Sequence, residues 1–179
     1  EPVFPGAELQ SYSNFSNVTL RMDPQSYLQF GTDDCYMSIW AYGGGNGQTL
    51  IIKERPDVDA HGALLLFQTD GKFRFYIRAN GDSSWTAFTA NAAYGNFWSH
   101  VLLVRRGSKM EGWVNGEFDN DISFSGNTNG GSKSAGMSIG KRYLNGNQVF
   151  TGKLAMAKIG RGSPSAADIK RMYNDERKL

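Results

Sequence analysis

The stretch Phe97-Trp-Ser-His-Val-Leu-Leu-Val-Arg105 is followed, after a short polar connection, by Met110-Glu-Gly-Trp-Val-Asn-Gly116. Both runs are rich in apolar, aromatic and β-branched residues, which favour extended strands. The connection Arg106-Gly-Ser-Lys109 has the length of a hairpin turn, and Asn115-Gly116 is a strong signal for a second tight turn. The sequence therefore predicts two antiparallel strands that are joined by one turn and closed by another.

Further strand patterns lie on both sides of this hairpin. In the segment 36–42, Met37, Ile39 and Ala41 alternate with larger residues, so they would share one face of a strand. Turn signals such as Asp70-Gly71 separate the runs. Short strands are expected at residues 27–30, 36–42, 49–53, 63–69, 72–78, 85–89, 99–105, 110–114, 137–140 and 153–159. Strands of this number and spacing are typical of a two-sheet sandwich.

One helix is expected, near the end of the chain. Ser163-Pro-Ser165 is a start signal, with Ser as the cap and Pro in the first turn. Asp168 stands three residues after Ser165, where a capping box has Glu or Gln. The apolar residues that follow have helical spacing and would dock the helix on the sandwich. They are Ile169, Met172 and Tyr173.

The composition is that of a globular domain. The chain has 179 residues, of which 40% are hydrophobic and 20% are charged, and its net charge is +2. These values predict neither disorder nor a nucleic-acid partner. The longest apolar run, Ala63–Phe67, is too short to insert into a membrane. Cys35 is the single cysteine, which excludes an internal disulfide. We expect one domain over residues 1–179, with an N-terminal arm at 1–19 and a docking helix at 163–175.

Three stretches, in this order, resemble the concanavalin A-like lectin/glucanase superfamily in its laminin-G-like branch. They are Asp33–Trp40, the hairpin of residues 97–116, and Phe150–Ile159 with the helix Ser165–Tyr173. The resemblance implies an all-β fold, a two-sheet antiparallel jelly-roll sandwich with a short C-terminal α-helix. The tail from Ile169 onward also resembles the ends of such domains in structural proteins of tailed bacteriophages, which decorate tails or capsids.

The resemblance implies a non-catalytic structural or attachment domain on the surface of a tailed-phage virion. Its partners would be other virion proteins, further copies of itself in a homo-oligomer, and glycans of the host cell surface. One alternative is an extracellular glycan-binding module of the laminin-G type. Another is a degenerate polysaccharide hydrolase or lyase. A position in the virion, glycan binding that requires Trp85, and turnover of a polysaccharide would distinguish the three.

Catalytic groups are not found in the patterns that this fold uses. Its glucanases carry Glu-x-Asp-x-x-Glu on one strand, and Asp119-Asn-Asp121 has only two acids. The two histidines, His61 and His100, lack the Gln-x-His context of the lyases. His100 is better explained as a packed histidine that is bonded to a neighbouring strand. We therefore expect no enzymatic activity.

Sugar binding needs an exposed aromatic ring beside hydrogen-bonding groups, since sugar C–H faces stack and hydroxyls need partners. Trp85 follows the polar residues 82–84, and Arg78 could cross the same face. Tyr143, in a second polar loop, is another candidate. Packing of Trp85 on a sheet is an equal alternative. Trp40 and Trp98 match core positions of the resemblance and are expected to be buried.

Calcium is common in this superfamily and prefers six to eight oxygen ligands. Two acidic clusters on expected turns, Asp33-Asp34 and Asp119-Asn-Asp121, are the candidate Ca²⁺ ligands. The alternative is that these carboxylates are solvated or accept hydrogen bonds from turn backbone. No other cofactor is expected.

Overall fold

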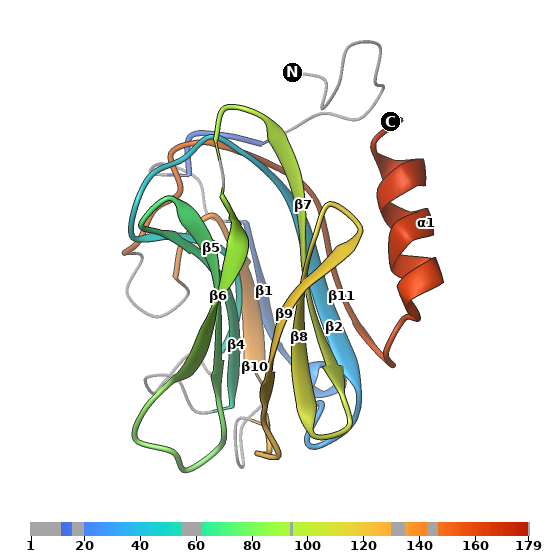
Figure 1. The fold of residues 1–179 in the computed structure, drawn as a ribbon. Coiled ribbons are helices and arrows are strands. Elements are labelled where there is room, and N and C mark those ends of the chain that lie inside the picture. The colour runs from blue at the N-terminus through green and yellow to red at the C-terminus, as the bar shows by residue number, and fades with distance from the viewer. Residues whose placement is uncertain are drawn as a thin grey trace.

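The computed structural model describes residues 12–15, 20–54, 62–93, 95–129, 135–142 and 147–178. These residues form two antiparallel sheets that face each other, and one α-helix lies on the outer side of one sheet (Figure 1). The six-stranded sheet has the order β1 (Leu20–Gln25), β10 (Ala135–Ile139), β3 (Gln48–Glu54), β4 (Ala63–Thr69), β5 (Lys72–Arg78) and β6 (Thr86–Ala93). The five-stranded sheet has the order β11 (Lys153–Arg161), β2 (Cys35–Tyr42), β7 (Trp98–Arg106), β8 (Lys109–Val114) and β9 (Glu117–Ser123).

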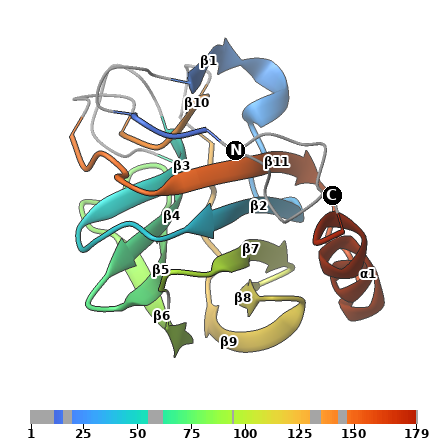
Figure 2. The same ribbon diagram turned by 90° about the horizontal axis from the view of Figure 1, so that it is seen from above.

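The predicted all-β, two-sheet antiparallel sandwich with a C-terminal helix is confirmed. Viewed from above, β1 and β6 lie at the two edges of one sheet, and the helix α1 (Ala166–Glu176) stands beside the other sheet (Figure 2). The predicted hairpin is present, because β7 and β8 pair in register from Val101–Val114 to Arg106–Lys109. No helix of the described residues is long and apolar enough to cross a membrane.

The core lies between the sheets and is built by the alternation of each strand. Met37, Ile39 and Ala41 on β2 point into it, as predicted. Phe75 on β5 stacks on Phe88 of β6, with 4.8 Å between ring centroids. Each such side chain contributes up to about 1.5–3 kcal/mol when it is fully buried.

Two hairpin turns use the residue pairs that the sequence indicated. Asp70-Gly71 joins β4 to β5 with φ values of 51° and 74°, and Asn115-Gly116 joins β8 to β9 with 53° and 80°. Positive φ at both central positions is the requirement of a type I′ turn, and Asp or Asn followed by Gly meets it at low cost.

Two buried cations hold the loops at one end of the sandwich. Lys53 is fully buried, and its ammonium donates to the carbonyl oxygens of Gly62 (2.7 Å) and Thr128. Burial lowers the pKa of Lys53 to about 8. Arg105 donates to the carbonyl oxygens of Gly31 (2.9 Å) and Gly126 (2.8 Å). Because backbone carbonyls in loops lack strand partners, these side chains satisfy them.

The helix begins at a capping box. The Ser165 hydroxyl accepts from the backbone N–H of Asp168, and the Asp168 carboxylate accepts from the N–H of Ser165. Pro164 lies just before the N-cap residue Ser165. The prediction that Pro164 lies in the first turn of the helix is therefore wrong. Ile169 is fully buried with Met172 packed beside it, and Tyr173 stacks on Trp40, so all three predicted residues face the sandwich.

Three strand assignments from the sequence differ from the structure. Residues 27–30 were expected to be extended, but Ser26–Leu28 form a 3₁₀ turn whose Leu28 is buried. The strands β1 and β9 were not expected. Both are edge strands with residues that are rare in strands, Pro24 in β1 and the run of residues 119–121 in β9. Pairing with β10 and β8 overrides those weak local preferences.

Candidate functional site

The outer face of the six-stranded sheet carries a row of aromatic side chains. Phe67 on β4, Tyr76 on β5 and Trp85, just before β6, stand on three consecutive chain segments. Their rings meet edge to face, with centroid distances of 5.6 Å (Phe67–Tyr76) and 5.8 Å (Tyr76–Trp85). Such contacts fix ring orientation and add about 0.5–1.5 kcal/mol each beyond area burial. The three rings therefore have fixed orientations on this face of the sheet.

A groove of about 220 Å³ runs along this row. Arg142 and Gln148 bring hydrogen-bonding groups to a groove whose other walls are apolar or aromatic. Arg142 Nη2 donates to the Glu54 carboxylate at 2.9 Å, and the Glu54 side chain is fully buried. The groove is lined by Leu65, Phe67, Tyr76, Trp85, Arg142 and Gln148.

The structure places the three predicted glycan-binding residues as follows. Trp85 is half-buried and packs on the cluster of Ile52, Leu65 and Phe67, so it is neither a free ring nor a core ring. Arg78 lies on the outer face of β5, and its Nε donates to the Asp82 carbonyl at 2.8 Å. Tyr143 lies outside the described residues. A binding role for all three stays a prediction.

Sequence reasoning missed the side chains that complete the groove. Tyr76 could have been found, because it alternates with Arg78 and so had to share its face. Arg142, Gln148 and Phe67 could not, because their meeting with Trp85 depends on the pairing of distant segments.

The predicted calcium ligands at Asp33 and Asp34 have partners within the chain. Arg161 Nη1 donates to Asp33 at 2.9 Å. The two Asp34 oxygens accept from the Gly107 N–H and the Ser163 hydroxyl, each at 2.7 Å. These bonds, the Gly107 one foremost, lower the pKa of Asp34. Asp34 thereby ties the β7–β8 turn to the segment that leads into the helix.

The second pair of predicted calcium ligands is occupied in the same way. Asp119 accepts the backbone N–H groups of Asn91 (2.6 Å) and Ala92 (3.0 Å), which links the edge strands β9 and β6 across the two sheets. Asp121 accepts from Lys109 at 2.6 Å. Within the described ranges, no group of three or more His, Cys, Asp or Glu side chains could hold a metal ion. Calcium binding stays a prediction, and the described residues do not supply a complete set of ligands for it.

His100 takes part in a buried network beneath the helix. Its ring lies 5.3 Å from the ring of Trp40, and its Nε2 lies 3.8 Å from the Glu176 carboxylate. Trp40 Nε1 donates to that carboxylate at 2.7 Å, and Lys158 donates to its other oxygen. The expected packing of His100 is therefore present, but its ring faces the helix instead of bonding to a neighbouring strand. Burial lowers the pKa of His100 to about 4, so the ring is neutral at pH 7.

The other tryptophans divide between the helix interface and the surface. Trp40 is buried, as expected. Trp98 was expected to be buried but is half-buried, packed on Tyr42 with 5.6 Å between centroids. Trp113 packs with Ile169 of the helix. None of these rings reaches the groove of Trp85.

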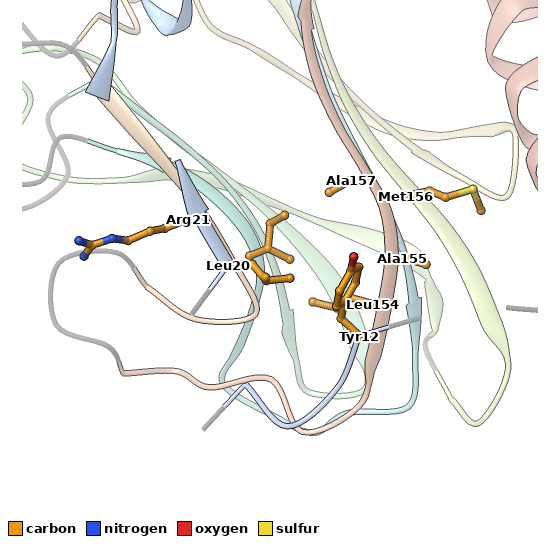
Figure 3. Close-up of a pocket in the computed structure, with 8 residues that line it drawn as sticks. Tyr12, Leu20, Arg21, Leu154, Ala155, Met156 and Ala157 are labelled. Atoms are coloured by element: carbon orange, nitrogen blue, oxygen red, sulfur yellow. The ribbon is translucent and has the colours of Figure 1, made fainter. Parts of the chain in front are cut away.

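A second pocket, of about 420 Å³, lies at the opposite edge of the sandwich, between β1 and β11 (Figure 3). Leu20 and Leu154 face each other across it, together with Tyr12. Arg21 points away from the pocket, and Met156 points toward the helix side of β11 (Figure 3). Although this pocket is larger, it offers few hydrogen-bonding groups, so the groove of Trp85 is the better site for a polar ligand.

Comparisons with known proteins place this fold. The family model of the concanavalin A-like lectin/glucanases superfamily matches residues 13–170. A search of curated proteins found no match. Among solved structures, the CBM40 of the Ruminococcus gnavus IT-sialidase, bound to α2,3-sialyllactose, aligns with a TM-score of 0.65 at 13% identity, over 80% of this chain and 84% of that one.

Two further structures are similar. Domain 4 of AbnA, a GH43 extracellular arabinanase from Geobacillus stearothermophilus in complex with arabinotriose, aligns with a TM-score of 0.68 at 12% identity, over 91% of this chain and 76% of that one. The binding domain of Paraclostridial Mosquitocidal Protein 1 aligns with a TM-score of 0.62 at 13% identity, over 93% of this chain and 45% of that one. At these identities the likeness shows the fold alone, and it confirms the predicted jelly-roll sandwich.

Proposed function

This chain belongs to the concanavalin A-like lectin/glucanase superfamily, and from that membership we propose that it is a carbohydrate-binding domain. The groove on the outer face of the six-stranded sheet is its binding site. One observation carries the proposal: half-buried Trp85 and Tyr76 border the same groove as Arg142 and Gln148. Aromatic rings next to amide and guanidinium donors are what a sugar ring and its hydroxyls require.

The size of the groove suits contact with one sugar unit of a glycan. Its volume of about 220 Å³ is below that of pockets that enclose whole drug-sized ligands, about 300–1,000 Å³. A glycan would therefore place one sugar unit against Trp85 and extend over the sheet on either side. Solved structures of the same fold support the proposal, since one is bound to sialyllactose and another to arabinotriose.

Replacing the stacking ring tests the site. Trp85→Ala is expected to weaken binding to the glycans that the wild-type protein retains on an array by about tenfold or more, because loss of a stacking hot spot costs about 1–3 kcal/mol. Trp85→Phe, which keeps a ring, should restore part of the affinity. Isothermal titration measures both, and thermal melting shows whether each variant is folded.

The matched control is Phe118→Ala. Phe118 is an exposed aromatic residue, 52% exposed, on β9 of the other sheet. The Phe118→Ala variant should leave glycan binding unchanged. If Trp85→Ala unfolds the domain, or if it binds glycans as tightly as the wild type, the groove is not the binding site.

The proposal includes the absence of catalysis. The carboxylates Asp119 and Asp121 are engaged by backbone N–H groups and by Lys109, and His100 lies beneath the helix. Incubation with a panel of polysaccharides should release no product. Product release that is abolished by Asp119→Ala or Asp121→Ala would instead revive the hydrolase or lyase alternative.

The biological setting that we propose is attachment to host surface glycans from the surface of a tailed-phage particle. The residues from Ile169 to the end of the chain, which resemble the ends of phage structural domains, support it. Association with other virion proteins and with further copies of the chain belongs to the same proposal. Copurification with virion proteins would support it, and a bacterial or animal extracellular source would favour the laminin-G-type module.

A further inference from the structure

The outer face of β5 carries a row of half-buried cations that is interrupted by one aromatic ring. Because side chains alternate along a strand, Lys72, Arg74, Tyr76 and Arg78 share the outer face, while Phe73, Phe75 and Ile77 enter the core. Alternate residues of a strand lie about 7 Å apart, so three positive charges are spread over about 20 Å beside the groove.

The neighbouring strands do not neutralise this row. Lys72 pairs across the sheet with Thr69 and Ala93, and Arg74 pairs with Phe67 and Thr89. Arg78 pairs with Ala63. Cross-strand partners of a charged residue are often of opposite charge, since such pairs stabilise a sheet. Among the residues that the structure describes, no acidic side chain forms an ion pair with any of the three cations.

Arg74 is held in place next to the groove. Its Nη1 donates to the Tyr76 hydroxyl at 3.2 Å, and its guanidinium lies 5.4 Å from the centre of the Tyr76 ring. Its Nε is buried and has no hydrogen-bond acceptor in the described parts of the chain. A buried donor without an acceptor is costly, and a bound anion would satisfy it.

Among the residues that the structure describes, acidic groups are few around the groove. Glu54 is buried and already pairs with Arg142 at 2.9 Å. Asp70 and Asp82 stand in the turns at the two ends of β5, where Asp82 offers its carbonyl to Arg78. The described residues of the face that surrounds Tyr76 and Trp85 are therefore predominantly positively charged.

We propose that the ligand of this face is an acidic glycan, which presents carboxylate groups to Arg74, Arg78 and Lys72 while a sugar unit lies against Tyr76 and Trp85. This inference rests on the proposed function and names its substrate class. Arginine is suited to the role, because its planar guanidinium binds a carboxylate through two parallel hydrogen bonds. The uncharged strands on either side leave the cations available to the ligand.

The test uses acidic glycans that are each paired with a neutral counterpart of the same chain, made by reducing the carboxyl groups. The wild-type protein should bind acidic members of the pairs at least about tenfold more tightly, and added salt should reduce that preference. Arg74→Gln should weaken binding of the acidic glycans about tenfold, the change expected when a hydrogen bond to a charged group is lost. Arg74→Lys should recover part of it.

Lys170→Gln is the matched control, since it removes one exposed cation from α1, on the opposite sheet. It should leave binding unchanged. Equal binding of acidic and neutral members, with loss on Trp85→Ala, would overturn the charge inference and leave the glycan site standing. Equal affinity for single-stranded DNA of matched charge would show a general polyanion surface and overturn the inference. Failure to bind any glycan of the panel would overturn both proposals.

Discussion

A chain that ends at Arg161, without α1, is expected to melt at least about 10 °C below the full chain or to remain unfolded. Removal of the helix uncovers Trp40, Leu102 and Val104, whose exposed fractions in the folded protein are 1% or less. It also deletes Ile169 and the Tyr173 ring that stacks on Trp40 at a centroid distance of 5.5 Å.

The expected size follows from burial. Each large apolar side chain of the interface contributes up to about 1.5–3 kcal/mol, so the helix accounts for roughly 5 kcal/mol of a typical total of about 5–15 kcal/mol. In a domain of this size, 1 kcal/mol corresponds to about 2–4 °C of melting temperature. Circular dichroism melting of both chains measures the difference.

A point variant separates docking from chain length. Ile169→Ala in the full chain should cost about 2–5 kcal/mol, because Ile169 is fully buried. Lys170→Ala, one residue further on the exposed side of the same helix, should change the melting temperature little. Equal melting temperatures for the full and shortened chains would contradict the docking role.

The sequence was informative wherever a structural preference is local. The bounds of β4 and β5 match the predicted runs 63–69 and 72–78, because the apolar run of β4 and the alternating pattern of β5 meet at the turn pair Asp70-Gly71. The apolar face of α1 was predictable for the same reason, since Ile169, Met172 and Tyr173 lie within two turns of one helix. In both cases a period of two or 3.6 residues is written into neighbouring positions.

Features that depend on distant partners could not be read in this way. Glu176 lies in a charged tail, yet it is buried and accepts a hydrogen bond from Trp40, 136 residues earlier. Likewise Arg142 enters the groove through its pair with Glu54, 88 residues away. Such contacts are set by strand order and by helix position, which no short segment specifies.

Acid is expected to destabilise the domain through His100 between about pH 6.5 and pH 4. Burial is the main cause of the lowered pKa of about 4 in the folded protein, opposed by the Glu176 carboxylate and assisted by the Lys158 ammonium. The unfolded chain binds a proton near pH 6.5, whereas folded His100 resists it until about pH 4. Protonation therefore favours unfolding, and this stability is present above pH 6.5 and is lost as the pH falls to about 4.

A pKa difference between 6.5 and about 4 corresponds to a loss of about 3 kcal/mol in the free energy of unfolding. Urea unfolding at pH 7, 6, 5 and 4 measures it. His100→Phe keeps a ring beside Trp40 and Tyr173 and removes the titrating group, so the stability of this variant should vary much less over this range. His61→Gln, which changes the other histidine of the chain, should retain the wild-type dependence of stability on pH.

Asp34, whose pKa is lowered from 3.8, loses its contribution to stability only at more acidic pH, so the effects of His100 and Asp34 occupy different pH ranges. If His100→Phe loses stability with acid as steeply as the wild type, the buried histidine beneath α1 is not the group that makes the fold sensitive to acid.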